Sequence, residues 1–211
     1  MSNHTLYLAS KSPRRRSLLE GLGYDVRVLG KSKEPMGYFP GDEEVLEKES
    51  PETYVMRTAL EKFREGIALK SALGAGAADA PVLVADTTVS LGENILGKPR
   101  DEAEAVRFLL ALSGRAHDVR TAVVVGRTWE DRQDRVQCSQ VHFRKISPEE
   151  AIAYARTGEP YDKAGGYGIQ GLAGIFVERI EGSFTGIMGL PVFEAAELLR
   201  AHGVLPRGFD K

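Results

Sequence analysis

The chain contains 211 residues, of which 42% are hydrophobic and 27% charged, and its formal net charge is −2. This balance argues against long-range attraction for nucleic acid or anionic lipid, and no stretch approaches the roughly 20 apolar residues of a membrane-spanning helix. The single cysteine, Cys138, excludes an internal disulfide, and the N-terminus lacks the basic segment of a signal peptide. We therefore expect a cytoplasmic protein that binds neither nucleic acid nor membranes.

The first half of the chain alternates strand and helix signals. Short apolar runs indicate strands, whereas Pro at the first helical position and Gly just past the end mark helix boundaries. The patterns predict a strand at Thr5–Ser10, a helix between Ser12 and Gly23, a strand at Tyr24–Leu29, a loop at Gly30–Ser50, a long helix from Pro51, a loop at Ala72–Ala80, and a strand at Pro81–Leu91 followed by a hairpin arm at Ile95–Gly97.

The second half continues the mixed pattern. Ser147 to Glu150 has the sequence of a capping box with Pro at the first helical position. We predict a helix at Asp101–Ser113, a strand pair at Val119–Arg127 and Asp134–Ile146, a helix from Ser147 to Gly158, a strand at Gly174–Ile180 and a helix at Pro191–His202. Because no repeat or low-complexity linker separates these elements, residues 1–211 are expected to form one α/β domain with a mixed central sheet and flanking helices.

The only dense basic cluster lies where the first strand passes into the first helix. A helix N-terminus offers unpaired N–H groups, Arg14 and Arg15 add forked donors, and the Ser10 and Ser12 hydroxyls can bind the same anion. This arrangement favours a phosphate site. The alternative is that Ser12 only caps the helix and the arginines are solvated.

A carboxylate follows the apolar run Val82–Ala85. We interpret Asp86 as lying at the end of a buried strand, the place where α/β active sites tend to lie. It could bind a metal or accept a proton from water, although its ordinary pKa of about 3.9 requires help for base chemistry at neutral pH. A hairpin would return Lys98 towards Asp86. The alternative is a strand-end Asp that caps a turn.

Gly166, Gly168 and Gly171 match the spacing of a dinucleotide-binding loop. We reject that interpretation because the fingerprint needs a strand before it and a helix after it. The glycines instead indicate close approach of the backbone to a ligand, with the Gln170 amide able to read a base edge. The four histidines show no metal-ligand spacing.

Several short motifs together resemble the Maf family of nucleotide pyrophosphatases, in order and across nearly the whole chain. They are Leu8-Ala-Ser-Lys-Ser-Pro-Arg-Arg15, Ala85-Asp-Thr87, Gly97-Lys-Pro-Arg100, Leu112-Ser-Gly114, Asp162-Lys-Ala-Gly-Gly-Tyr-Gly-Ile-Gln-Gly171 and Gly182-Ser-Phe with Gly189-Leu-Pro191. The resemblance implies a fold similar to the inosine triphosphate pyrophosphatases, elongated with two lobes around a central cleft, and an assembly that is frequently a homodimer.

The resemblance also implies roles for single residues. Asp86 would be the proton acceptor, with Lys62 and Lys98 beside it, and Glu34 and Asp86 would bind a divalent cation, Mg²⁺ or Mn²⁺. The substrate would be bound by Ser10, Ser12, Arg14, Arg15, Thr87, Lys163 and Gln170.

The implied reaction is metal-assisted hydrolysis of a nucleoside triphosphate to the monophosphate and pyrophosphate. The form of the segment around Gln170 resembles the branch that acts on dTTP and UTP. Two alternatives stay open: a regulator of septum formation that acts by protein binding, and a house-cleaning enzyme for modified or non-standard nucleotides.

Overall fold

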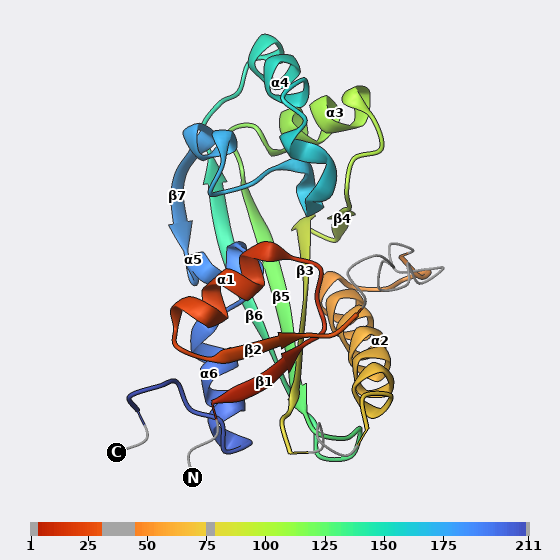
Figure 1. The fold of residues 1–211 in the computed structure, drawn as a ribbon. Coiled ribbons are helices and arrows are strands. Elements are labelled where there is room, and N and C mark those ends of the chain that lie inside the picture. Colours follow the sequence, from red (N-terminus) through yellow and green to blue (C-terminus); the bar gives the residue numbers. More distant parts are fainter. Residues whose placement is uncertain (1–3, 31–44, 75–78, 210–211) are drawn as a thin grey trace.

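The computed structural model describes residues 4–30, 45–74 and 79–209. Figure 1 shows an elongated molecule in which long strands of one sheet run from the end that carries α2 and α6 to the end that carries α3 and α4. None of the helices within the described ranges is long and apolar enough to cross a lipid bilayer.

One mixed sheet forms the centre. β1 is parallel to both of its neighbours, β2 and β3, whereas β3, β5, β6 and β7 pair antiparallel in that order. The short β4 folds back antiparallel on the far end of β3. The strands are β1 (Thr5–Leu8), β2 (Asp25–Val28), β3 (Val82–Leu91), β4 (Asn94–Leu96), β5 (Ala116–Gly126), β6 (Gln133–Phe143) and β7 (Val177–Glu181).

Several helices begin at a side-chain cap. Side chains of Ser50, Asp101 and Ser147 accept hydrogen bonds from backbone N–H groups of the first turn, and Ser147 completes a capping box with Glu150. The helices are α1 (Pro13–Gly21), α2 (Pro51–Ser71), α3 (Glu102–Leu112), α4 (Pro148–Ala155), α5 (Phe184–Ile187) and α6 (Val192–Ala201), with short 3-10 helices at Glu159–Asp162, Ala164–Gly166 and Leu172–Phe176.

The central strands alternate their side chains between two cores. Leu83 and Val123 pack against α1 and α6, whereas Val82, Val84 and Val124 pack against α2 on the opposite face. This is the period of two that a strand covered on both faces requires. Because each fully buried aliphatic side chain contributes roughly 1.5–3 kcal/mol, the two cores fix which way every later side chain of β3 points.

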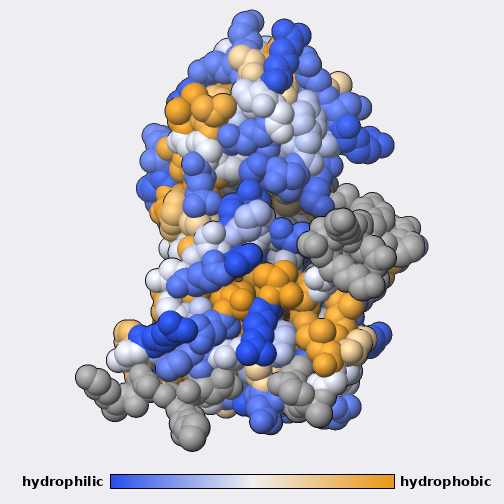
Figure 2. Space-filling model, viewed as in Figure 1, coloured by the Kyte–Doolittle hydropathy of each residue, from blue (hydrophilic) through white to orange (hydrophobic). Residues whose placement is uncertain are grey.

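A third core lies at the other end of the long strands. Leu109 and Leu112 of α3, Tyr154 of α4, and Val141 and Phe143 of β6 are buried together there. Figure 2 shows that the outer surface of this end is mainly hydrophilic on the face drawn, whereas hydrophobic side chains gather in the other half between α1 and α2. The molecule thus buries apolar residues at both ends of one sheet.

The expected mixed α/β architecture is confirmed, and most predicted elements appear within a few residues of their expected bounds, including the β3–β4 and β5–β6 hairpins. Two predictions were wrong. Asp86 does not end its strand, because β3 continues to Leu91. The strand predicted at Gly174–Ile180 begins only at Val177, because residues 172–176 form a 3-10 turn whose N–H groups Glu159 binds. The loop expected at Gly30–Ser50 lies mostly outside the described residues.

α2 packs closely against the sheet at Gly66, where an added Cβ would lie 2.9 Å from Ala9 Cβ and 3.0 Å from a Val82 methyl. We predict that Gly66→Ala lowers the free energy of unfolding by about 1–2 kcal/mol, because overpacking outweighs the better helix propensity of Ala. Urea denaturation measures this change.

Gly21, in α1, is the matched control, since nothing lies within 4 Å of an added Cβ there. Gly21→Ala should leave stability unchanged or raise it by up to about 1 kcal/mol. Equal effects of the two substitutions would contradict this account of the contact between α2 and the sheet.

Candidate active site

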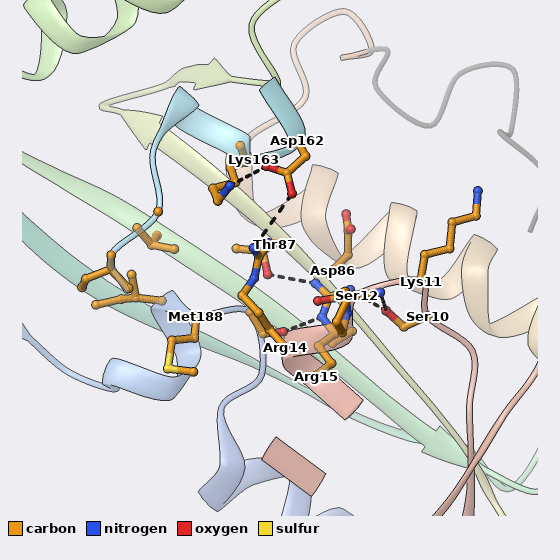
Figure 3. A pocket seen from close by; sticks show the side chains of 18 of the residues that line it. Ser10, Lys11, Ser12, Arg14, Arg15, Asp86, Thr87, Asp162, Lys163 and Met188 are labelled. Atoms are coloured by element: carbon orange, nitrogen blue, oxygen red, sulfur yellow. Dashed lines mark hydrogen bonds and ion pairs between the residues drawn. The ribbon is translucent and has the colours of Figure 1, made fainter. Parts of the chain in front are cut away.

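A cavity of about 710 Å³ lies between the two ends of the molecule. Its lining comes from segments far apart in the sequence: the β1–α1 turn, α2, the middle of β3, the segment after β4, β5, the turns after α4, and the end of α5 with the turn that follows it. Figure 3 shows the charged side chains of α1 facing those of the 3-10 turn around Asp162 across this space. The volume is in the range of pockets that bind small molecules.

The cavity opens at an interruption in the edge of the sheet. β1 pairs with β3 only through Val82 and Leu83, and β4 pairs with β3 only from Val89 onward. Residues 84–88 therefore have β5 on one side and no described strand on the other. Asp86 and Thr87, which point to opposite faces of the sheet, both reach the same cavity through this interruption.

The Asp86 carboxylate is held from α2. Lys62 Nζ donates to Oδ1 at 2.7 Å and the Thr58 hydroxyl donates to Oδ2. The Asp86 side chain is 14% exposed and that of Lys62 is 23% exposed, so water screens this ion pair only in part. The arrangement fixes a carboxylate at the cavity wall with a cation beside it.

Arg15 braces the basic side of the cavity. It donates from Nε to the Gly189 carbonyl at 2.7 Å, from Nη1 to Ser10 Oγ at 3.3 Å, and from Nη2 to Thr87 Oγ1 at 3.2 Å. Burial lowers the pKa of Arg15, the charge of Asp86 opposes that shift, and Arg14 adds to it. Arg15 still carries two N–H groups beyond these three bonds, which can bind an anion.

The start of α1 offers further donors. Ser10 Oγ accepts from the backbone N–H of Ser12 at 3.1 Å, so its own proton remains to be donated. The side chain of Ser12 makes no capping bond to the helix. The alternative that Ser12 serves only as the helix cap therefore does not hold in the structure. The Arg14 side chain, 38% exposed, extends across the cavity towards Asp162, with Nη1 3.9 Å from Oδ2 (Figure 3).

The opposite wall is built from the turns after α4. Lys163 Nζ contacts the Asp162 carboxylate at 2.5 Å and donates to the Glu159 carbonyl at 2.7 Å. Gln170 is exposed at the cavity lining between two glycines. This glycine-rich segment follows a 3-10 turn rather than a strand, in agreement with the rejection of a dinucleotide-binding loop.

A buried polar pair, His117 and Tyr167, lies behind this wall of the cavity. Tyr167 lines the cavity, and its hydroxyl lies 2.7 Å from His117 Nε2 within the third core. Burial, reinforced slightly by His142 and opposed by Asp118, lowers the pKa of His117 to about 4. His117 is therefore neutral at physiological pH.

The structure brings nearly all of the residues named from the sequence to this one cavity. Ser10, Ser12, Arg14, Arg15, Lys62, Asp86, Thr87, Lys98, Lys163 and Gln170 all line it. Lys98 follows β4, and the β3–β4 hairpin returns it towards Asp86 as expected. The position of Glu34 falls outside the described residues. The individual roles of these side chains stay predictions.

Sequence reasoning missed Thr58, Glu65 and Glu159. Thr58, Lys62 and Glu65 are spaced i, i+4 and i+7 on α2, so the helical period places them on one side of the helix, a pattern that could have identified them. Glu65 lines the cavity, and its buried Oε2 has no hydrogen-bond partner among the described residues. The role of Glu159 depends on contacts that the sequence pattern does not reveal.

The donor set fits a cation that shares its coordination with a substrate. No three His, Cys, Asp or Glu side chains within the described ranges form a metal cluster. Mg²⁺, however, is commonly bound by one or two carboxylates together with water and substrate phosphates. Asp86 and the partnerless Glu65 oxygen are suitable ligands of that kind in the same cavity.

Comparison with protein families matches residues 5–202 to the family described as Maf-like protein. The chain belongs to the Maf family. It is 47% identical over 203 residues to a protein of Neisseria meningitidis serogroup B, covering 95% of each chain, and 48% identical over 204 residues to one of Burkholderia thailandensis, covering 94% of this chain and 93% of the other. Both relatives are named dTTP/UTP pyrophosphatase.

Two solved structures resemble part of the chain more distantly. A nucleoside-triphosphatase, or dITP/XTP pyrophosphatase, from Mycobacterium abscessus is 15% identical, with a TM-score of 0.40, and covers 67% of this chain and 75% of its own. The Staphylococcus aureus Ham1 protein is 17% identical, with a TM-score of 0.35, and covers 66% and 71%.

The low pKa of His117 gives a prediction for stability against pH. Because the folded protein keeps His117 neutral while the unfolded chain protonates near pH 6.5, stability is lost as the pH falls from 6.5 towards 4. His117→Gln removes this proton uptake, so the loss of unfolding free energy between pH 7 and pH 5 should be smaller by about 2 kcal/mol. Urea denaturation at both pH values measures it, and equal losses in both proteins would contradict the assignment.

Proposed function

We propose that this chain hydrolyses dTTP and UTP to the monophosphate and pyrophosphate. One observation carries the proposal: a carboxylate, Asp86, is held by Thr58 and Lys62 beside the basic side of a nucleotide-sized cavity. The family and the names of its close relatives support the same reaction and the same pyrimidine substrates.

The triphosphate binds at the basic side of the cavity. Arg14 and Arg15 offer forked donors at the start of α1, the Ser10 and Ser12 hydroxyls lie beside them, and Lys98 enters from β4. Binding a triphosphate releases Arg14 from Asp162, an exposed contact of 3.9 Å that costs little to break. These cations then offset the negative charge that develops on the departing pyrophosphate.

Asp86 accepts the proton of the attacking water. Lys62 and Thr58 aim its carboxylate at the cavity, so the base is positioned before the substrate arrives. A divalent cation, Mg²⁺ or Mn²⁺, would be held by Asp86 with Glu65 and the substrate phosphates, together with Glu34 as expected from the sequence. When bound, such a cation acidifies water and neutralises phosphate charge.

The nucleobase of the substrate lies at the wall formed by the turns after α4. Gln170 presents an amide that can donate to one base atom and accept from another, and Lys163 lies between this wall and the phosphates. Thr87 acts less directly, since its hydroxyl is already bonded to Arg15 and Thr121. It positions Arg15 rather than contacting the base.

The proposed reaction requires only a nucleotide and a divalent cation as partners of the protein. A cytoplasmic location, a homodimer, a single two-lobed domain and the absence of nucleic-acid binding stay predictions from the sequence. Gel filtration with light scattering measures the oligomeric state directly.

The test is pyrophosphate release from dTTP, UTP, CTP, GTP, 7-methyl-GTP and ITP with Mg²⁺ or Mn²⁺. We expect fastest release from dTTP and UTP, and a fall of about 10²- to 10⁴-fold in Asp86→Asn because the proton acceptor is lost. Asp134→Asn, a substitution on β6 outside the cavity, is the matched control and should keep wild-type rates.

Two results would contradict the proposal. Absence of release from every nucleotide would refute hydrolysis, and undiminished release by Asp86→Asn would refute the role of this carboxylate. Fastest release from ITP or 7-methyl-GTP would move the substrate class away from pyrimidines.

A further inference from the structure

Glu159 lies behind the segment that carries Gln170 and bonds directly to its backbone. Its Oε1 accepts from the Tyr154 hydroxyl at 2.7 Å, and its Oε2 accepts from the backbone N–H of Leu172 at 2.9 Å. The N–H of Ala173 approaches Oε1 at 3.5 Å. One carboxylate thus ties the first turn of the 3-10 helix at Leu172–Phe176 to α4.

The same carboxylate is enclosed by glycine backbone. A Cβ added to Gly171 would lie 2.3 and 2.4 Å from the two carboxylate oxygens of Glu159, whereas a Cβ on Gly168 would lie 2.8 Å from Lys163 Cε and 3.3 Å from Glu159 Oε1. The Gly168 N–H also donates to the Tyr154 hydroxyl at 3.3 Å. The segment from Gly168 to Ala173 therefore packs against Glu159, Lys163 and Tyr154, and the glycine at position 171 leaves room for the Glu159 carboxylate.

Glu159 stays ionised although it is partly buried. Burial raises the pKa of Glu159. The N–H of Leu172, the Tyr154 hydroxyl and the charge of Lys163 together lower this pKa by more than burial raises it, so that the net shift is downward. An anion at the lining of a cavity that takes an anionic ligand opposes binding. The hydrogen bonds of Glu159 run to the backbone behind the cavity, which indicates that its charge holds this backbone in place.

Gln170 depends on this support. Its side chain is exposed and makes no hydrogen bond within the part of the chain that the structure describes. Its place depends on the backbone from Gly168 to Gly171, which is held at one end by the Tyr154 hydroxyl and just past the other end by Glu159, and these two side chains are bonded to each other. An amide reads a base edge only when its donor and acceptor are held in register with the base.

We propose that Glu159 is a positioning residue for base selectivity: by binding the backbone N–H groups of Leu172 and Ala173 and the hydroxyl of Tyr154, it holds the Gln170 amide where it distinguishes the 4-carbonyl of thymine or uracil from the 4-amino group of cytosine. This inference rests on the proposed hydrolysis of dTTP and UTP. Glu159 touches neither the phosphates nor the attacking water in this arrangement.

The experiment compares kcat/KM for UTP and CTP in the wild type, Glu159→Ala and Glu159→Gln. In Glu159→Ala the UTP-to-CTP ratio should fall by about 5- to 10-fold, the equivalent of one lost hydrogen bond, through a higher KM for UTP with kcat for UTP nearly unchanged. Glu159→Gln keeps an oxygen that can accept from the Leu172 N–H, so its UTP-to-CTP ratio should lie between those of the wild type and Glu159→Ala. This second variant provides the test if Glu159→Ala fails to fold.

Glu150→Ala is the matched control. Glu150 is a carboxylate of the same end of the molecule, bonded to Arg144 and the capping box of α4 and absent from the cavity lining. Its removal should lower thermal stability and leave the UTP-to-CTP ratio at the wild-type value. A merely structural role of Glu159 would produce the same result as this control.

The outcomes separate the two claims. A wild-type ratio in folded Glu159→Ala or Glu159→Gln would overturn the role of Glu159 and leave the proposed hydrolysis intact. A wild-type enzyme that hydrolyses UTP and CTP equally would overturn the preference for uracil over cytosine, and with it the selectivity assigned to Glu159, whereas a wild-type enzyme that does not hydrolyse UTP would overturn the proposed function itself.

Discussion

The site depends on an interruption in hydrogen bonding along one edge of β3. β1 pairs with β3 at only two positions before the chain turns into α1, and β4 begins to pair only at Val89. The open edge between them lets side chains from both faces of the sheet reach one space. The side chain of Asp86 lies on the α2 face of the sheet and that of Thr87 on the α1 face, and the start of α1 lies beside both.

This geometry also explains how opposite charges share a small volume. The Asp86 carboxylate is paired with Lys62 from α2, while Arg15 is braced by neutral oxygens of Ser10, Thr87 and Gly189. Removing one member of a partly buried pair leaves an uncompensated charge, which costs more than the pair itself gains. Asp86 and Arg15 therefore keep separate sets of partners, and in the proposed complex a phosphate chain and a cation would lie between them.

Much of this could be predicted from the sequence because it is local. Caps, turn glycines and apolar runs located the helices and hairpins, and the strand–turn–helix at Ser10–Arg15 identified the phosphate side. The strand predicted at Pro81–Leu91 matches β3, but the interpretation of Asp86 as a strand end was wrong, because the apolar run stops at this carboxylate while the strand continues to Leu91. The turn at 172–176 was missed because Glu159, 13 residues earlier, decides its conformation.

The central claim is that water activated at Asp86 attacks the α phosphorus while the basic side of the cavity holds the leaving pyrophosphate. Hydrolysis of dTTP in H₂¹⁸O, followed by mass spectrometry of both products, tests it most directly. The account predicts that ¹⁸O appears in dTMP and not in pyrophosphate. Label in pyrophosphate would mean attack at the β phosphorus and would contradict the assigned geometry.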